Sequence, residues 1–127
     1  MSFEKAFEHL KKYQLEDRVI VFPVLTSTVK EAANALGSKE GEIAKSLAFL
    51  VNDKAVLVIA AGDQKIDNAK FKMEFNVKAK MIAFNEVGNI IGHDAGGVCP
   101  FGVNEGVSVY LDESLKKYEI VYPACGS

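Results

Sequence analysis

The sequence has few of the side chains that bind structural metals. Its 127 residues include two cysteines, Cys99 and Cys125, and two histidines, His9 and His93. The cysteines are 26 residues apart and no CxxC motif is present, whereas a structural zinc site takes four ligands at short, characteristic spacings. We therefore expect no metal and no other cofactor, and in a cytosolic chain we expect both thiols to be free.

Long apolar runs and an excess of positive charge are also missing. No apolar run approaches the roughly 20 residues that a membrane span needs, and residues 1–17 are too polar for a secretory leader. The formal net charge is −2, with 25% charged and 49% hydrophobic residues. Extensive binding of duplex DNA needs a strongly basic face, which a chain of this net charge is not expected to have. The sequence thus predicts a cytosolic protein that binds neither DNA nor membranes, although contact with the end of a nucleic acid stays open.

The chain length and the hydrophobic pattern predict one compact domain. Apolar runs predict strands over residues 19–22, 47–51, 55–61, 79–84, 107–111 and 119–122. Helices are expected from Phe3, after Thr28, after Ser38, after Asp67 and from Asn85, with a turn or short helix over residues 112–117. Thr28 and Glu31 have the spacing of a capping box. Because strands and helices do not alternate regularly, we expect an α/β (α+β) domain with one mixed sheet.

Glycine is concentrated in one segment of the chain. Six of the ten glycines lie between Gly88 and Gly106, together with His93, Cys99 and the rigid corner Pro100-Phe101. Glycine permits a positive φ and a close approach of the backbone, so such a loop can direct several N–H groups at one phosphate oxygen or developing oxyanion. A pair of tight turns between strands is the structural alternative. The neighbouring histidine, cysteine and proline favour a functional site.

One single lysine and one cluster of lysines each have both a functional and a structural interpretation. Lys45 lies where the helix expected after Ser38 gives way to a strand. It either is solvated at the helix end or holds a phosphate or ester oxygen. Between Lys65 and Lys80, five lysines that include Lys70 and Lys72 outnumber two acidic residues. This segment is either solvated surface or an attractive surface for RNA phosphates.

Three further side chains are candidates for chemistry. His93 and Cys99 suit a cysteine hydrolase, with a thiolate nucleophile and an imidazole base, but apart from the adjacent Asp94 no third residue is evident. A cysteine before a proline also packs well in a core, and His93 more readily contacts a substrate or orients a water. Asp63, after Gly62, either binds a ribose or an amine or forms a turn.

Four segments, taken in this order, resemble the YbaK/ProX family, the free-standing relatives of the editing domain of bacterial prolyl-tRNA synthetase. They are Thr28 to Gly37, Ile43-Ala44-Lys45-Ser46-Leu47, Ala61-Gly62-Asp63 and Gly96-Gly97-Val98-Cys99-Pro100-Phe101-Gly102. Each segment alone is a weak signal, but four in register are specific, and the resemblance runs from the first helix to residue 127. It implies a mixed, partly closed β-sheet wrapped by short helices.

The resemblance also implies an activity, the hydrolysis of the ester that joins a wrong amino acid to tRNA, often the tRNA for proline. The implied partners are the acceptor end of that tRNA and an aminoacyl-tRNA synthetase. The implied catalytic residues are Lys45, Gly96, Gly97 and Gly102. The expected substrate-binding residues are Thr28, Asp63, His93, Cys99 and Phe101, and the expected RNA-binding residues are Lys65, Lys70 and Lys72. Family members typically continue beyond residue 127 into a further strand or helix, so the resemblance implies that this single domain over residues 1–127 lacks a C-terminal element.

The chemistry of an aminoacyl ester is consistent with this activity. The ester is already activated, so an oriented water and a backbone oxyanion site suffice, and the adjacent ribose hydroxyl can assist the water. Alanine, serine and cysteine would fit a pocket lined by residues 47–49 and 98–101. The alternatives are a non-catalytic module that binds aminoacyl-tRNA, a nucleotide or a synthetase, and a cysteine hydrolase that acts on small esters.

Overall fold

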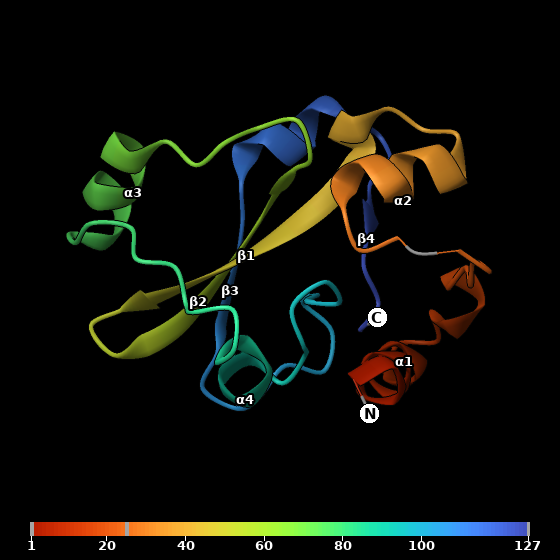
Figure 1. Ribbon diagram of the computed structural model, residues 1–127, viewed down its shortest axis with the longest axis horizontal. Coiled ribbons are helices and arrows are strands. Elements are labelled where there is room, and N and C mark those ends of the chain that lie inside the picture. Colours follow the sequence, from red (N-terminus) through yellow and green to blue (C-terminus); the bar gives the residue numbers. More distant parts are fainter. Residues whose placement is uncertain (1, 25, 127) are drawn as a thin grey trace.

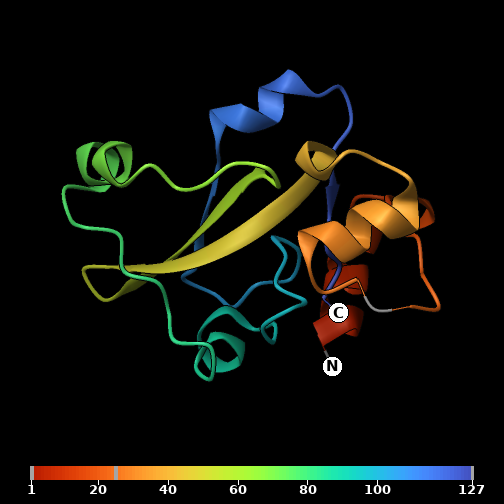
Figure 2. The same cartoon turned by 45° about the horizontal axis from the view of Figure 1, so that its top comes forward.

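A four-stranded mixed sheet forms the centre of the computed structural model, which describes residues 2–24 and 26–126 (Figure 1). The strand order is β3-β2-β1-β4. The long strands β1 (Ile43–Val51) and β2 (Lys54–Ala61) are antiparallel. The short strands β3 (Ser108–Leu111) and β4 (Tyr122–Pro123) are parallel to β2 and β1, respectively. The sheet is curled, and short helices surround it (Figure 2), which confirms the expected mixed sheet in a single α/β domain.

A two-residue turn joins β1 to β2. Asn52 and Asp53 both adopt a positive φ, of 50° and 67°, and Val51 pairs with Lys54 across the turn. Two consecutive positive φ values are the signature of the type I′ turn, whose twist matches that of the flanking strands. The turn therefore sets the register of all eight residue pairs between β1 and β2.

Short helices begin and end at residues that the sequence marks clearly. The helices are α1 (Ser2–Lys12), α2 (Val29–Leu36), α3 (Asn68–Phe75) and α4 (Val87–Ile91), with 3₁₀ turns at Glu16–Arg18, Glu40–Glu42 and Glu113–Lys117. Thr28 and Glu31 form the expected capping box at α2, and Gly37 ends this helix in the left-handed conformation. The Asp67 side chain caps α3 by accepting from the Lys70 N–H. None of the described helices has the length and apolar character to cross a bilayer.

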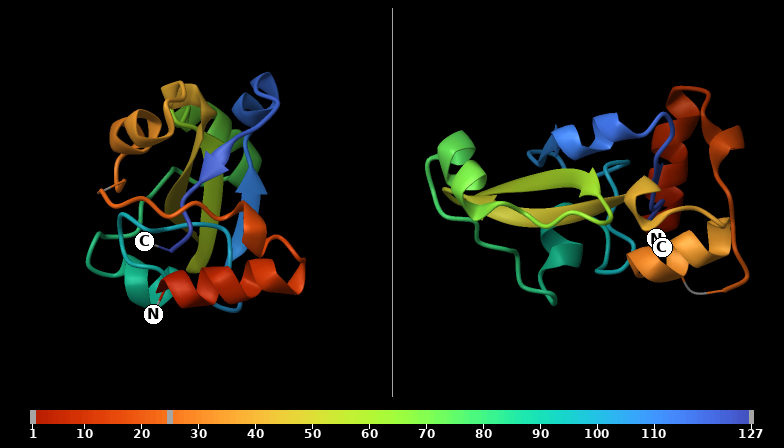
Figure 3. Two further views of the ribbon diagram at one scale, coloured as in Figure 1. Left: turned by 90° about the vertical axis from the view of Figure 1, so that its right-hand side faces the viewer. Right: turned by 90° about the horizontal axis from the view of Figure 1, so that it is seen from above.

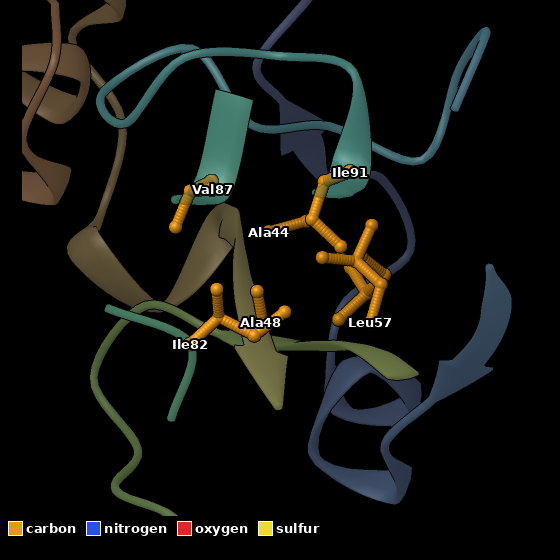
Figure 4. Packing of buried hydrophobic residues seen from close by; sticks show 7 residues of the cluster. Ala44, Ala48, Leu57, Ile82, Val87 and Ile91 are labelled. Atoms are coloured by element: carbon orange, nitrogen blue, oxygen red, sulfur yellow. The ribbon is translucent and has the colours of Figure 1, made fainter. Parts of the chain in front are cut away.

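The two faces of β1 pack against different parts of the chain. Ala44 and Ala48 face a buried cluster that includes Val87 and Ile91 of α4 (Figure 4). On the other face, Phe49 packs against Phe71 of α3, with ring centroids 4.8 Å apart. Because side chains alternate along a strand, neighbouring residues of β1 belong to separate interiors.

Two of the expected strands are not strands in the structure. Residues 19–22 form no strand and pair with none in the described part of the chain, and Ile20 and Val21 are exposed. Residues 79–84 make one isolated bridge, between Met81 and Phe49. Two backbone hydrogen bonds flank this bridge, from Leu50 N–H to Lys80 O and from Ile82 N–H to Ala48 O. Apolar runs predicted strands in both places, but an apolar run also occurs where residues line a cavity or pair with a strand at a single position.

The prediction of a helix after Ser38 is also wrong. The segment forms only the turn Glu40–Glu42, and β1 begins directly at Ile43. Gly41 is buried at a close contact, where a Cβ atom would lie 2.6 Å from Cζ of Tyr118. Lys45 therefore lies inside a strand, instead of at the end of a helix.

The N- and C-terminal ends of the described chain lie near each other, as all views show (Figure 3). Helix α1 packs against the glycine-rich segment, since the backbone oxygen of Lys5 lies close to Gly102. The first helix and the glycine-rich loop are thereby held at the same end of the sheet.

Replacement of Asp53 by glycine is expected to stabilise the protein by about 0.5–1 kcal/mol, because glycine adopts a positive φ without a steric cost. Urea unfolding followed by circular dichroism measures the change. Asp53→Ala is the matched control and is expected to destabilise the protein. A glycine variant no more stable than the alanine variant would contradict this account of the turn.

Candidate functional site

A cavity of about 1080 Å³ lies beside β1, where Ala44, Ser46 and Ala48 contribute to its lining. Its walls come from α1, residues 18–22, α2, β1, the glycine-rich loop and residues 120–125. Three of the four segments that carry the family resemblance contribute to this lining, with Thr28, Lys45, Gly96 and Phe101. The fold thus brings residues that are far apart in the sequence to one concave site.

The cavity is mainly apolar and carries positive charge. Arg18 and Lys45 are its cationic residues, and among the described residues no aspartate, glutamate or histidine contributes to the lining. The lining therefore favours an anionic or neutral ligand over a cationic one. It therefore offers no carboxylate or imidazole of the described chain as a general base, and its other side chains of the types that transfer protons are Lys45, Tyr122 and Cys125. No group of three or more acidic, histidine or cysteine residues in the described chain is arranged to hold a metal ion.

Lys45 combines a place in the cavity wall with a structural contact. Its Nζ donates to the backbone oxygens of Gly62, at 3.5 Å, and of Gln64. Burial lowers the pKa of Lys45, the carboxylate of Asp63 opposes that shift, and the charge of Lys65 adds to it. Lys45 thus links β1 to the chain that leaves β2, beside the cavity.

The three glycines predicted to be catalytic occupy different surroundings. Gly96, with φ of +94°, lines the cavity, and within residues 2–24 and 26–126 its N–H makes no hydrogen bond. The N–H of Gly97 donates to the backbone oxygen of Asp94 at 3.0 Å. Gly102 does not line the cavity and instead lets α1 approach the loop. Of the three, only Gly96 combines a place in the cavity lining with an N–H that has no hydrogen-bond partner in the described chain.

His93 and Cys99 are buried inside the glycine-rich loop and do not line the cavity. His93 Nε2 lies 2.6 Å from the backbone oxygen of Phe101, and Cys99 Sγ lies 3.5 Å from the same oxygen. Burial lowers the pKa of His93, and the bond to Phe101 opposes that shift. A neutral His93 that donates from Nε2 satisfies this geometry. The expectation that these side chains bind substrate is not supported by their positions, which brace the loop from within.

The thiol of Cys99 is poorly suited to act as a nucleophile. Burial raises its pKa to about 12, and the side chain is fully buried. Since the thiolate is the reactive form, the geometry disfavours a cysteine hydrolase that uses this pair.

Thr28, Asp63 and Phe101 differ in their access to the cavity. Thr28 lines it, although its hydroxyl oxygen already accepts the Glu31 N–H at 3.1 Å. Phe101 also lines the cavity. Asp63 lies outside the lining, is exposed, and accepts from the hydroxyl of Tyr118 at 3.4 Å. Of the expected pocket walls, residues 47–49 and 98–101, the residues Ala48, Val98 and Phe101 line the cavity.

The predicted RNA-binding lysines are exposed and lie mainly on the other side of the sheet. Lys70 and Lys72 belong to α3, whose Phe71 packs on the face of β1 that points away from α4. Lys65 precedes that helix and is near enough to Lys45 to affect its pKa. Of the three, Lys65 has the clearest link to the site.

Ser46 and Arg18 line the cavity and were missed in the sequence. Ser46 Oγ is buried and has no hydrogen-bond partner among the described residues. The strand alternation that places Ser46 between Ala44 and Ala48 would have identified it. The mistaken helix after Ser38 concealed this alternation, because it placed Lys45 at a helix end.

The two cysteines are expected to differ in reactivity. At pH 8 a thiol with a pKa of about 12 is ionised in only about one molecule in ten thousand. We expect a soluble disulfide reagent to modify the half-buried Cys125 of the folded protein first and Cys99 only on unfolding. Absorbance of the released thiolate in wild type and Cys125→Ala measures this order. Rapid modification of Cys99 in folded Cys125→Ala would contradict the burial argument.

Gly102→Ala is expected to destabilise the protein by about 2 kcal/mol or more, because it combines an unfavourable φ with a steric clash. A Cβ atom at this position would lie 2.5 Å from the backbone oxygen of Lys5. Gly106→Ala is the matched control, since its φ is also positive but no atom lies within 4 Å of the added Cβ. Denaturant unfolding measures both variants, and equal losses would contradict the role of the contact with α1.

Known proteins resemble this chain along almost its whole length. It is 44% identical to YwhH of Bacillus subtilis across 100% of this chain and 82% of that protein. It is 30% identical to the proline–tRNA ligase of Geobacillus sp. across 99% of this chain, but across only 21% of the ligase. The similarity to the ligase is therefore confined to one part of that enzyme.

Solved structures share the same fold. A candidate trans-editing enzyme for prolyl-tRNA synthetase superposes with a TM-score of 0.88 at 32% identity, over 99% of this chain and 81% of that one. The protein APE2540 superposes with a TM-score of 0.86 at 28% identity, over 97% and 83% of the two chains. Residues 24–127 match the family described as the aminoacyl-tRNA editing domain. By sequence and by fold, this chain belongs to the YbaK/ProX family of aminoacyl-tRNA editing domains, which is related to the editing domain of prolyl-tRNA synthetase.

Proposed function

We propose that this protein is a trans-editing hydrolase that removes a small, wrong amino acid from tRNA, with the tRNA for proline as its main substrate. The observation that carries the proposal is that Lys45, Gly96 and Phe101 line one and the same cavity, in a member of the aminoacyl-tRNA editing domain family. The cavity is large enough for a small aminoacyl group and part of the terminal nucleoside. Its partner in this proposal is the acceptor end of the tRNA, and an aminoacyl-tRNA synthetase is a second partner.

The charges of the site suggest how the substrate lies. Arg18 and Lys45 are the cationic residues of the lining, so the terminal phosphate and ribose are placed on their side of the cavity. Lys65 lies near Lys45 and extends the positive charge outward. Lys70 and Lys72 then contact the tRNA only farther from its reactive end. The remaining, apolar lining receives the amino acid.

Hydrolysis in this site needs no ionisable side chain as a base. The water oxygen attacks the ester carbonyl carbon, and the bond between that carbon and the ribose oxygen breaks. The neighbouring ribose hydroxyl takes up a proton from the water and relays one to the leaving oxygen. The unpaired N–H of Gly96 stabilises the negative charge that develops on the carbonyl oxygen. The absence of aspartate, glutamate and histidine from the described lining is consistent with this substrate-assisted route.

Lys45 and the glycine loop have separate roles in this scheme. Lys45 orients the ribose or its phosphate, and orientation of the reacting groups lowers the barrier by preorganisation. Gly102, His93 and Cys99 act only through the shape of the loop, because they do not line the cavity. Asp63 does not line the cavity either. In this scheme it affects hydrolysis only through the segment after β2 whose backbone oxygens Lys45 contacts.

The proposal is tested by the release of labelled amino acid from proline tRNA charged with alanine, serine, cysteine or proline. We expect release above the spontaneous rate for at least one small amino acid and none for proline. Lys45→Ala is expected to lower this rate at least about tenfold. Cys99→Ala is expected to retain activity, because its thiol is buried and protonated.

Two controls separate catalysis from folding. Lys54→Ala removes an exposed lysine at the hairpin end of β2 and is expected to leave the rate unchanged. Thermal unfolding of Lys45→Ala shows whether the loss of the contacts with Gly62 and Gln64 unfolds the chain. Tight binding of charged tRNA without release, by a folded wild-type protein, would replace the hydrolase with a non-catalytic binding module. An equal loss of activity in Cys99→Ala and Lys45→Ala would contradict the proposed mechanism.

A further inference from the structure

Large apolar side chains are exposed around the mouth of the cavity. They belong to residues that line the cavity and are nevertheless more than half exposed to solvent, so together they form an apolar rim. The residues of this rim are Ile20, Val21, Val24, Met81, Phe84 and Ile120. Exposed apolar side chains that gather in one place mark a surface that a ligand or a partner covers.

Phe84 is the aromatic residue of this rim and its most exposed member, at 82%. Its ring pairs with no other aromatic ring within residues 2–24 and 26–126. A side chain that stays this exposed removes little apolar surface from water, so it adds little to folding stability. Packing within the described chain therefore does not account for an aromatic ring at this position.

The backbone on both sides of Phe84 is held in place. Ile82 donates a backbone hydrogen bond of 3.0 Å to β1, and the side chains of Ile82 and Val87 are buried in one cluster (Figure 4). Between these two anchors, the Glu86 N–H donates to the backbone oxygen of Ala83 at 2.9 Å and closes a turn that contains Phe84. The ring thus projects from a fixed backbone, which lowers the entropy cost of binding a ligand there.

A nucleobase is the ligand that suits an exposed ring with cations nearby. Arg18 and Lys45 line the same cavity, and the exposed Lys80 precedes Phe84 in the chain, while Glu86 follows it. Bases stack on aromatic side chains through their flat faces, and neighbouring cations hold the phosphates that join them. The rim and the cavity together therefore offer both parts of a single-strand binding site.

The covalent structure of a charged tRNA places its last base at this rim. Every tRNA ends in an adenosine whose ribose carries the aminoacyl ester. In the function proposed above, this ribose lies beside Arg18 and Lys45 and the amino acid enters the apolar interior. The adenine is attached to another carbon of the same ribose, and the preceding nucleotides leave through the opening. The adenine consequently lies at the mouth of the cavity.

We propose that Phe84 is the platform on which the terminal adenine of the tRNA stacks. This inference rests on the proposed function, and it adds a nucleotide-binding residue to the same site. The adenine takes no part in the reaction, so stacking stabilises the bound substrate and the transition state equally. The platform accordingly raises the affinity for the tRNA end and does not discriminate between amino acids.

The first test compares uncharged proline tRNA with the same tRNA lacking its terminal adenosine, in a filter-binding assay. We expect wild type to bind the intact tRNA at least about fivefold more tightly than the shortened one. Phe84→Tyr is expected to keep this difference, because it keeps the ring, and Phe84→Leu is expected to lose most of it. Met73→Leu is the matched control, since Met73 is exposed on α3, and it is expected to behave as wild type.

Fluorescence gives a direct signature of stacking. The chain contains no tryptophan, so Phe84→Trp introduces one indole at the rim, and Met73→Trp introduces one on α3 as a control. We expect intact tRNA to quench Phe84→Trp more strongly than shortened tRNA does, and the control to show no such difference. Equal quenching of Phe84→Trp by both tRNAs would overturn the proposal. An emission shift of Phe84→Trp that depends on protein concentration, without tRNA, would replace the adenine with a second copy of the chain.

Thermal unfolding separates the platform from a structural role. Because the ring is exposed, Phe84→Leu is expected to unfold at the same temperature as wild type. A markedly lower unfolding temperature would show that the ring supports the fold and would overturn the proposal.

Hydrolysis distinguishes this proposal from the function on which it rests. In Phe84→Leu we expect the KM for charged tRNA to rise at least about fivefold while kcat stays nearly unchanged. Hydrolysis with an unchanged KM in this variant would support the hydrolase and overturn the role of Phe84. A binding difference that depends on Phe84, without hydrolysis, would support the platform and overturn the hydrolase. No binding of intact tRNA by folded wild type would overturn the platform.

Discussion

The antiparallel pairing of β1 with β2 is the constraint on which the rest of the structure depends. This pairing fixes the face of the sheet on which each side chain of β1 lies. The side chains of the two faces then pack into two separate buried clusters. On one side, Ala44, Ser46 and Ala48 line the cavity. On the other, Phe49 holds α3. The helices and the glycine-rich loop then attach to one face or the other, so the position of the cavity follows from the register of one hairpin.

The cavity combines a mainly apolar wall with a small number of polar residues, which include the cations Arg18 and Lys45 and several hydroxyl side chains. A site of this kind binds an uncharged group tightly and leaves an anionic group at its edge. The same composition suits an ester, whose reaction develops negative charge at one oxygen and requires little else. The loop that carries Gly96 is braced from within by His93 and Cys99, which are buried and both lie against the backbone oxygen of Phe101.

The sequence predicted the fold class, the hairpin, the caps at Thr28 and Asp67, and the family. These features depend on local patterns or on motifs in order along the chain. It did not predict that residues 19–22 form a cavity wall, because an apolar run looks the same whether it pairs in a sheet or lines a pocket. The helix expected after Ser38 failed because a tertiary contact at Gly41 decides the conformation there.

The candidate site was predicted in part. Lys45 and Gly96 were selected from the sequence and both line the cavity, whereas His93, Cys99 and Asp63 do not. Polar residue types at suggestive spacings cannot reveal whether a side chain points outward or supports a loop from inside. Ser46 was overlooked for the opposite reason, since its place in the cavity lining follows from the alternation of side chains along the strand and not from its residue type.

The alternation along β1 has a consequence for how such domains can diverge. Residues that shape the pocket and residues that hold α3 are adjacent in the chain but do not touch the same neighbours. Single substitutions at the pocket-facing positions can therefore alter the ligand that is accepted while the opposite interior is preserved. An insertion or deletion of one residue in the strand would exchange the two sets and destroy both. The strand thus permits new substrates to evolve through point mutations, and it strongly disfavours changes in its length.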